Sequence, residues 1–75
     1  MASLETTRRR QLLSQRGLAE RSGVSESTIY AIEGGKSTRP RLEVMRKLCD
    51  ALGVEPTDVD EFRRALESEP GRVAA

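Results

Sequence analysis

The chain has 75 residues, with 13 Lys/Arg, 12 Asp/Glu and no histidine. A chain of this length forms one small domain, which buries only about 60% of the surface that its unfolded state exposes. A single cysteine, Cys49, excludes an internal disulfide, and the lack of histidine argues against a zinc site. No segment approaches the ~20 apolar residues of a membrane span, and the N-terminal segment lacks the apolar core of a secretory signal. We therefore expect a cytoplasmic protein that is not an enzyme and uses no metal or cofactor.

The charges are distributed unevenly. Residues 1–41 hold eight Lys/Arg and four Asp/Glu, whereas residues 42–75 hold five and eight. A basic half of this kind suits a domain that turns one face to phosphates, although mixed charge that only keeps a small domain in solution explains the balance equally well. Tyr30 and Phe62 are the only aromatic residues, too few for a platform on which single-stranded bases stack. Double-stranded nucleic acid is therefore a better candidate for the ligand than a single strand.

The first expected helix runs from Leu4 to Leu13. Ser3 is placed to act as its N-cap, and Glu5 lies in the first turn, where a carboxylate complements the helix dipole. The apolar content of this helix is thin and consists of Leu4, Leu12, Leu13 and the methyl group of Thr7. The arginines at positions 8–10 form either a solvated surface or a phosphate-binding patch.

Residues 15–34 predict two short helices joined by one tight turn. The first runs from Gln15 to Ser22, and the second from Glu26 to Glu33. Gly23 can adopt positive φ and reverse the chain, and Ser25 can cap the second helix. The small side chain of Ala19 lets two steeply crossing helices approach. This is the pattern of a helix-turn-helix, whose second helix lies in the major groove of DNA.

The outward face of that second helix supplies the candidate base-contacting residues. Ile29 and Ile32 form its inward face, which leaves four residues on the outer side: Glu26, Ser27, Tyr30 and Ala31. A carboxylate accepts from cytosine N4, a serine hydroxyl bonds donors or acceptors, and an alanine contacts a thymine methyl. This face has no Gln, Asn, Lys or Arg, so we expect weak direct readout of the bases.

This segment resembles the lambda-repressor-like, or Cro/C1-type, helix-turn-helix family of phage repressors and xenobiotic-response-element regulators. A second similarity lies in residues 41–54, RLEVMRKLCDALGV, and the resemblance covers about residues 4–67. It implies an all-α, compact five-helix domain over residues 1–67. The matching residues are Gln15, Leu18, Ala19, Gly23, Val24, Ser25, Ile29, Ile32, Glu33, Gly35 and Lys36.

The resemblance also implies specific roles. Arg8 is expected to pair with Glu33, because the equivalent arginine of the family pairs with the acidic residue near the end of the recognition helix; a guanidinium can hold a carboxylate by two parallel hydrogen bonds. The loop after the second helix of the motif is expected to clamp the sugar-phosphate backbone, together with the start of the first. The expected phosphate-contacting residues are Ser14, Gln15, Lys36, Ser37, Thr38, Arg39 and Arg41.

Two more helices complete the expected fold. Apolar spacing predicts a fourth helix from about Arg41 to Leu52, with an inward stripe of Leu42, Met45, Leu48, Cys49 and Leu52. A fifth is expected to begin at Pro56-Thr57-Asp58 with Thr57 as its cap. Residues 68–75 have no periodicity and are expected to form a flexible tail. The candidates for a dimer interface near the fifth helix are Val54, Val59, Phe62 and Leu66.

The sequence thus predicts a sequence-specific, double-stranded DNA-binding regulator, expected to be a repressor of bacterial or phage type that acts at the nucleoid. The resemblance favours a homodimer, at least on DNA. The alternative is a protein-interaction module, such as the antitoxin of a toxin–antitoxin pair or a transcriptional co-activator with a protein partner. The acidic last third of the chain would serve that alternative.

Overall fold

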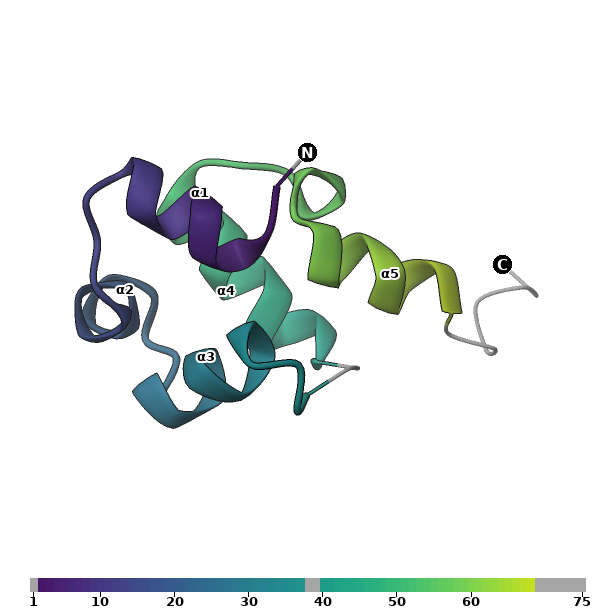
Figure 1. Cartoon of the computed structure of the whole chain (residues 1–75), viewed down its shortest axis with the longest axis horizontal. Coiled ribbons are helices and arrows are strands. Elements are labelled where there is room, and N and C mark those ends of the chain that lie inside the picture. The colour runs from purple at the N-terminus through teal and green to yellow at the C-terminus, as the bar shows by residue number, and fades with distance from the viewer. Residues whose placement is uncertain (1, 38–39, 69–75) are drawn as a thin grey trace.

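The computed structural model describes residues 2–37 and 40–68. Within them the chain forms α1 (Leu4–Arg10), α2 (Gln15–Ser22), α3 (Glu26–Glu33), α4 (Leu42–Leu52), the short 3₁₀ turn η1 (Pro56–Asp58) and α5 (Asp60–Ser68) (Figure 1). These residues contain no strand, only one isolated bridge between Ala2 and Val59. The predicted all-α, five-helix architecture is confirmed.

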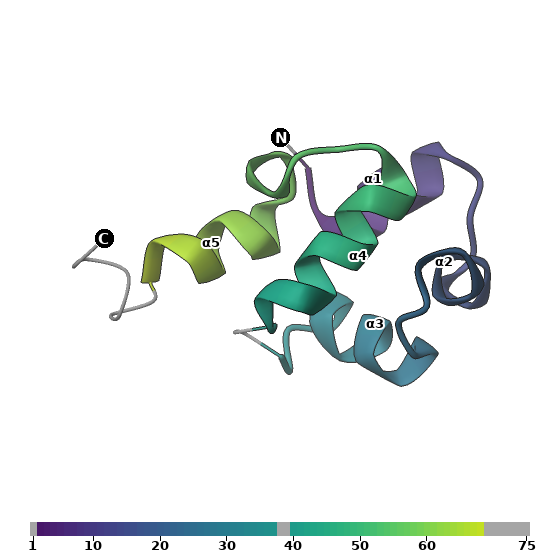
Figure 2. The same ribbon diagram turned by 180° about the vertical axis from the view of Figure 1, so that it is seen from behind.

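Helix α4 occupies the middle of the fold. Seen from behind, it crosses between α2 and α3 on one side and α5 on the other (Figure 2). Helix α2 packs on both α3 and α4, and α1 packs on α3. In the described part of the chain, every helix is too short or too polar to span a lipid bilayer.

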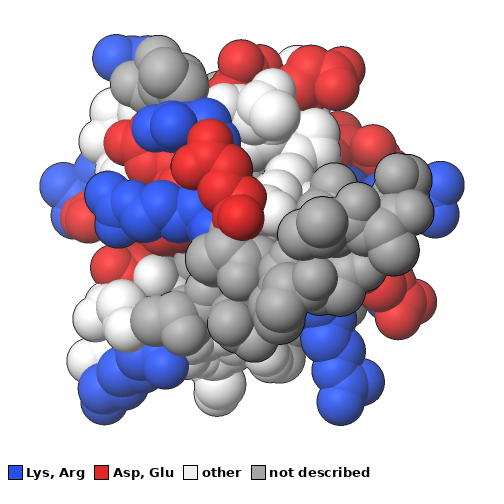
Figure 3. Space-filling view, turned by 90° about the vertical axis from the view of Figure 1, so that its right-hand side faces the viewer, with Lys and Arg blue, Asp and Glu red and all other residues white. Residues whose placement is uncertain are grey.

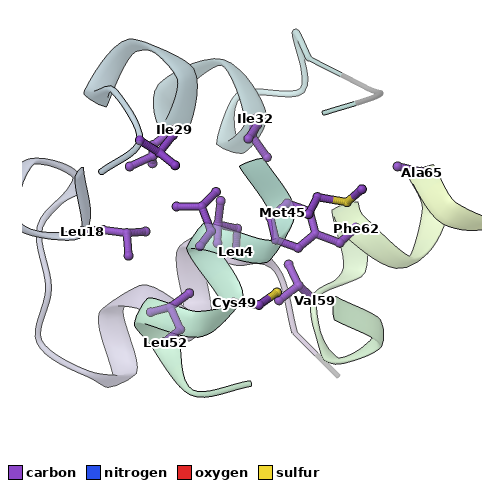
Figure 4. Close-up of a cluster of buried hydrophobic side chains, with 12 residues drawn as sticks. Leu4, Leu18, Ile29, Ile32, Met45, Cys49, Leu52, Val59, Phe62 and Ala65 are labelled. Carbon is purple, nitrogen blue, oxygen red and sulfur yellow. The ribbon is translucent and has the colours of Figure 1, made fainter. Parts of the chain in front are cut away.

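All five helices contribute to one core. Four of its largest side chains, those of Leu18, Ile29, Ile32 and Phe62, are completely buried, and they come from α2, α3 and α5 (Figure 4). The full cluster is Leu4, Leu18, Val24, Ile29, Ile32, Met45, Leu48, Cys49, Leu52, Val59, Phe62 and Ala65. Burial raises the pKa of the Cys49 thiol to about 11, so this cysteine packs as an unreactive apolar group.

Helix α1 ends three residues earlier than predicted, at Arg10. Leu12 adopts a left-handed conformation with φ 59°, and its N–H donates to Arg9 O at 2.9 Å while Leu13 N–H donates to Arg8 O at 3.2 Å. These two bonds form the Schellman motif, in which a glycine usually holds the left-handed position. Leu12, which the expected helix included, therefore lies beyond the end of α1, and 94% of its surface is exposed. The left-handed conformation of a leucine costs about 1–2 kcal/mol of conformational free energy, and no local sequence pattern indicates it.

The fifth helix also begins differently from the prediction. Pro56–Asp58 forms a separate 3₁₀ turn, and the capping box that opens it joins Glu55 to Asp58, so the expected cap at Thr57 is wrong. Helix α5 starts at Asp60, after Val59 has paired with the N-terminal segment: Asp60 N–H donates to Ala2 O at 2.8 Å. The Glu61 carboxylate then accepts from Leu4 N–H at 2.8 Å. These contacts tie α5 to the start of α1.

Two smaller corrections concern the start of α4 and the end of α5. Arg41 caps α4 rather than opening it, and Leu42 is 57% exposed, so it does not belong to the inward stripe. Ser68 forms the last residue of α5 rather than the first of a tail. The rest of the predicted tail lies outside the described residues.

Candidate nucleic-acid interface

Gly23 and Ser25 define the turn between α2 and α3. Gly23 adopts φ 79°, and its N–H donates to Ala19 O at 2.9 Å, which ends α2. Ser25 Oγ accepts from Thr28 N–H at 3.2 Å, which opens α3 as predicted. An L side chain would be strained at the φ of Gly23, which explains why glycine occupies this position of the turn.

Helix α3 divides into a buried and an exposed face. Ile29 and Ile32 have no exposed surface and anchor the helix to the core. On the other side Glu26, Ser27 and Tyr30 are exposed and Ala31 is half-buried. The four predicted base-contacting residues therefore lie on an accessible side of α3.

A buried ion pair fastens α1 to the end of α3. Arg8 Nε donates to Glu33 Oε2 at 2.8 Å and a second guanidinium nitrogen donates to Oε1 at 2.9 Å, so the pair is bidentate. Both side chains are nearly closed to solvent, at 7% and 6% exposure. The third guanidinium nitrogen donates to Leu13 O, and Gln15 Nε2 donates to Glu33 Oε1 at 3.0 Å. The structure contains the predicted pair and extends it to the first residue of α2.

This network decides the charge of Glu33. Burial, the strongest single influence, opposes ionisation of its carboxyl group. The hydrogen bonds from Arg8 and Gln15, together with the positive charge of Arg8, outweigh it and hold the pKa of Glu33 below its ordinary value of 4.5. Glu33 is therefore an anion at neutral pH and is ion-paired with Arg8.

The loop after α3 directs Lys36 back over the helix. Gly35 adopts φ 79°, Lys36 N–H donates to Ala31 O at 2.9 Å, and Gly35 N–H donates to Ile32 O, which is again a Schellman motif. The Lys36 ammonium lies 5.7 Å from the centre of the Tyr30 ring. Ser37 is half-buried, and its N–H also donates to Ala31 O. Thr38 and Arg39 lie outside the described residues.

The ends of α1, α2 and α3 enclose a polar hollow of about 630 Å³. Ser14 and Gln15, the predicted contacts at the start of α2, lie on its wall with Lys36. Arg41 lies at the start of α4 and does not line it. The lining consists of Glu5, Arg8, Arg9, Ser14, Gln15, Arg16, Glu26, Tyr30, Glu33, Gly34 and Lys36. The hollow thus brings basic side chains of three separate elements to one place.

Comparison with known families matches residues 2–62 to the family described as Helix-turn-helix domain. The chain belongs to this helix-turn-helix family. The family binds DNA and its members are typically not enzymes, so DNA is the expected partner of this helix-turn-helix domain. No curated protein and no solved structure matches the chain.

Two further arginines line the hollow, Arg9, which the sequence left open between solvated surface and phosphate patch, and Arg16, which it did not single out. Arg9 and Arg16 line it and are exposed at 71% and 79%, and each is bridged to a glutamate four residues away in the chain. The signal for Arg16 was present, because it follows Ser14 and Gln15 in the first turn of α2. Arg9 could be found only once the end of α1 was placed beside α2.

Gly17 lies inside α2, where glycine is less favourable than alanine, and its local contacts explain why it is there. Its N–H donates to the Ser14 hydroxyl at 2.9 Å, and a Cβ at this position would lie 3.3 Å from that oxygen and 3.5 Å from Leu13 Cδ2. Glycine thus leaves room for the N-cap of α2.

The four proposed dimer residues separate into two groups. Val59 and Phe62 have no exposed surface, so the expectation that they remain free for a second copy is wrong; they fill the core of their own chain instead. Val54 and Leu66 are half-buried and pack against the edge of the core. Both line a largely apolar groove of about 710 Å³ between α4 and α5.

Proposed function

We propose that this helix-turn-helix domain is a sequence-specific regulator of transcription that inserts α3 into the major groove of double-stranded DNA. The observation that carries the proposal is the accessible face of α3. That face is held rigidly by the buried Ile29 and Ile32 beneath it and by the Arg8–Glu33 pair at its end. Repression at a cytoplasmic promoter is the simplest outcome, since a domain bound there excludes other proteins without a further contact.

In this proposal the bases are read directly by side chains that extend only a short distance from α3. Ser27 can bond either base-edge donors or acceptors, Glu26 can accept from cytosine N4, and Ala31 can contact a thymine methyl group. Tyr30 lies on the same exposed side of α3. Each good base contact discriminates by about 1–3 kcal/mol, so we expect a short and imperfect consensus.

The backbone contacts supply most of the affinity in this proposal. Lys36 and the start of α2 line the polar hollow, and Arg41 is the N-cap of α4. We propose that these residues, with Ser37, Thr38 and Arg39, hold the phosphates. The end of the molecule that carries α5 shows Lys/Arg and Asp/Glu side chains next to one another (Figure 3).

Selection from random duplex DNA tests this function. The wild type is expected to enrich a short consensus, and Ser27→Ala is expected to relax the preference at one position while leaving the others unchanged. The matched control is Thr57→Ala, which removes an exposed hydroxyl on η1 outside the hollow. Recovery of sequences with no shared consensus would contradict sequence-specific binding.

We also propose that two copies bind together on DNA. One domain reads few bases, whereas two related by a two-fold axis place their recognition helices about 34 Å apart, or about ten base pairs. Val54 and Leu66 are the remaining candidates, because they border the α4–α5 groove.

Sedimentation on an imperfect palindrome tests the dimer. We expect two chains per duplex for the wild type and one for Leu66→Asp, with Leu12→Asp as the control, since Leu12 is exposed at the other end of the fold. A one-to-one complex of the wild type at saturation, with equal affinity for an isolated half-site, would contradict the dimer. It would favour a protein-interaction module, such as an antitoxin or a co-activator, that binds its partner in the α4–α5 groove.

A further inference from the structure

Tyr30 and Lys36 differ from the other proposed contacts because their side chains touch. The Lys36 ammonium lies 5.7 Å from the centre of the Tyr30 ring, within the range of a cation–π interaction. The ring is 58% exposed and sits on the outer side of α3. Both residues line the polar hollow beside Ser14 and Gln15.

The backbone of Lys36 is fixed independently of this contact. Its N–H is bonded to Ala31 O at 2.9 Å, and Gly35 holds the left-handed position before it. The remaining freedom lies in the four-carbon side chain, which is flexible in solution. The Tyr30 ring is a partner that can orient the ammonium.

We propose that Tyr30 is a positioning residue, whose ring holds the ammonium of Lys36 in the hollow at the start of α2, where it meets a phosphate of the DNA backbone. This inference rests on the proposed function. Tyr30 then acts through Lys36 on affinity for any duplex and contributes little to the choice of base.

The charges around the hollow support this role. Glu33 is already engaged by Arg8 and Gln15, which leaves Glu5 and Glu26 as the other carboxylates on its wall, and Glu5 is bridged to Arg9 at 2.8 Å. An aromatic ring is a neutral partner, so it orients the ammonium without neutralising it. Pairing with Glu26 would instead consume the charge that a phosphate requires.

The test is the salt dependence of binding to two duplexes, the sequence recovered by selection and a shuffled version of it. Lys36→Met is expected to reduce the log–log slope by about 0.9 and to weaken binding to both duplexes by the same factor. Tyr30→Leu is expected to reproduce most of that change on both duplexes. Tyr30→Phe keeps the ring and is expected to behave as the wild type.

The double variant completes the cycle. If the ring acts through the ammonium, Tyr30→Leu combined with Lys36→Met is expected to bind as Lys36→Met alone does. Lys47→Met, a partly exposed lysine on α4 outside the hollow, is the control and should leave the slope unchanged. Thermal melting of each variant checks that the fold is retained.

Two results would overturn the inference while leaving the proposed function intact. One is a Tyr30→Leu variant that loses preference for the selected duplex at an unchanged slope, which would make Tyr30 a base-reading residue. The other is additive effects of the two substitutions, which would make the residues independent. A wild type that binds both duplexes equally would instead contradict sequence-specific binding itself.

Discussion

Replacing Glu33 by Gln is expected to destabilise the domain by about 3–5 kcal/mol, because the change leaves the buried guanidinium of Arg8 without its counter-charge. Arg8 is only 7% exposed, so water cannot replace the lost carboxylate. Small domains unfold with a total of about 5–15 kcal/mol, so this single change removes a large share of the stability. Urea denaturation followed by circular dichroism measures it.

Glu20→Gln is the matched control for this prediction. Glu20 is 72% exposed and pairs with Arg16 at 3.6 Å, a surface arrangement that contributes at most about 1 kcal/mol. Equal, small effects of the two substitutions would show that the Arg8–Glu33 pair does not hold α1 to α3.

The same pair predicts how stability depends on pH. Because the pKa of Glu33 is lowered in the folded state, the unfolded chain binds more protons at this carboxyl in mild acid. The contribution of Glu33 is complete above its ordinary pKa of 4.5 and is lost as the pH falls through the lowered folded value. The difference in free energy of unfolding between the wild type and Glu33→Gln should therefore be constant near neutral pH and shrink in acid.

Phe62→Ala is expected to lower the free energy of unfolding by about 3–5 kcal/mol, because buried apolar surface is lost and a cavity remains. Phe62 has no exposed surface and is the largest fully buried side chain, so its removal weakens the packing of α5 on the rest of the fold. The same denaturation experiment measures the loss. Leu42→Ala serves as control, since Leu42 is 57% exposed and its truncation should change stability little. A small effect of Phe62→Ala at unchanged DNA affinity would place α5 outside the cooperative unit.

The parts of the fold that the sequence predicted well are those controlled by nearby residues. Ser14, Gly23 and Ser25 define the starts and the turn of α2 and α3 through contacts no more than four residues apart. The bounds of both helices therefore agree with the prediction. The Arg8–Glu33 pair spans 25 residues, and only the family resemblance indicated it.

The errors arose where distant segments decide the outcome. The end of α1 depends on a left-handed leucine, and the start of α5 depends on the pairing of Ala2 with the residues around Val59. Periodicity showed that Val59 and Phe62 form an apolar face, but it did not show whether that face meets the same chain or a second copy. For the same reason Arg9 was not assigned to the hollow.

The most direct test of the account is the ratio of affinities for the selected duplex and for its shuffled version, measured at one salt concentration near physiological. For recognition through α3 by two copies on DNA we expect the wild type to bind the selected duplex more tightly, by a ratio near the lower end of the ~10³–10⁷ that is typical of specific sites, because direct readout of the bases is weak. Alanine at both Glu26 and Ser27 is expected to reduce that ratio while leaving the salt slope unchanged. Equal affinity of the wild type for the two duplexes would contradict the central claim.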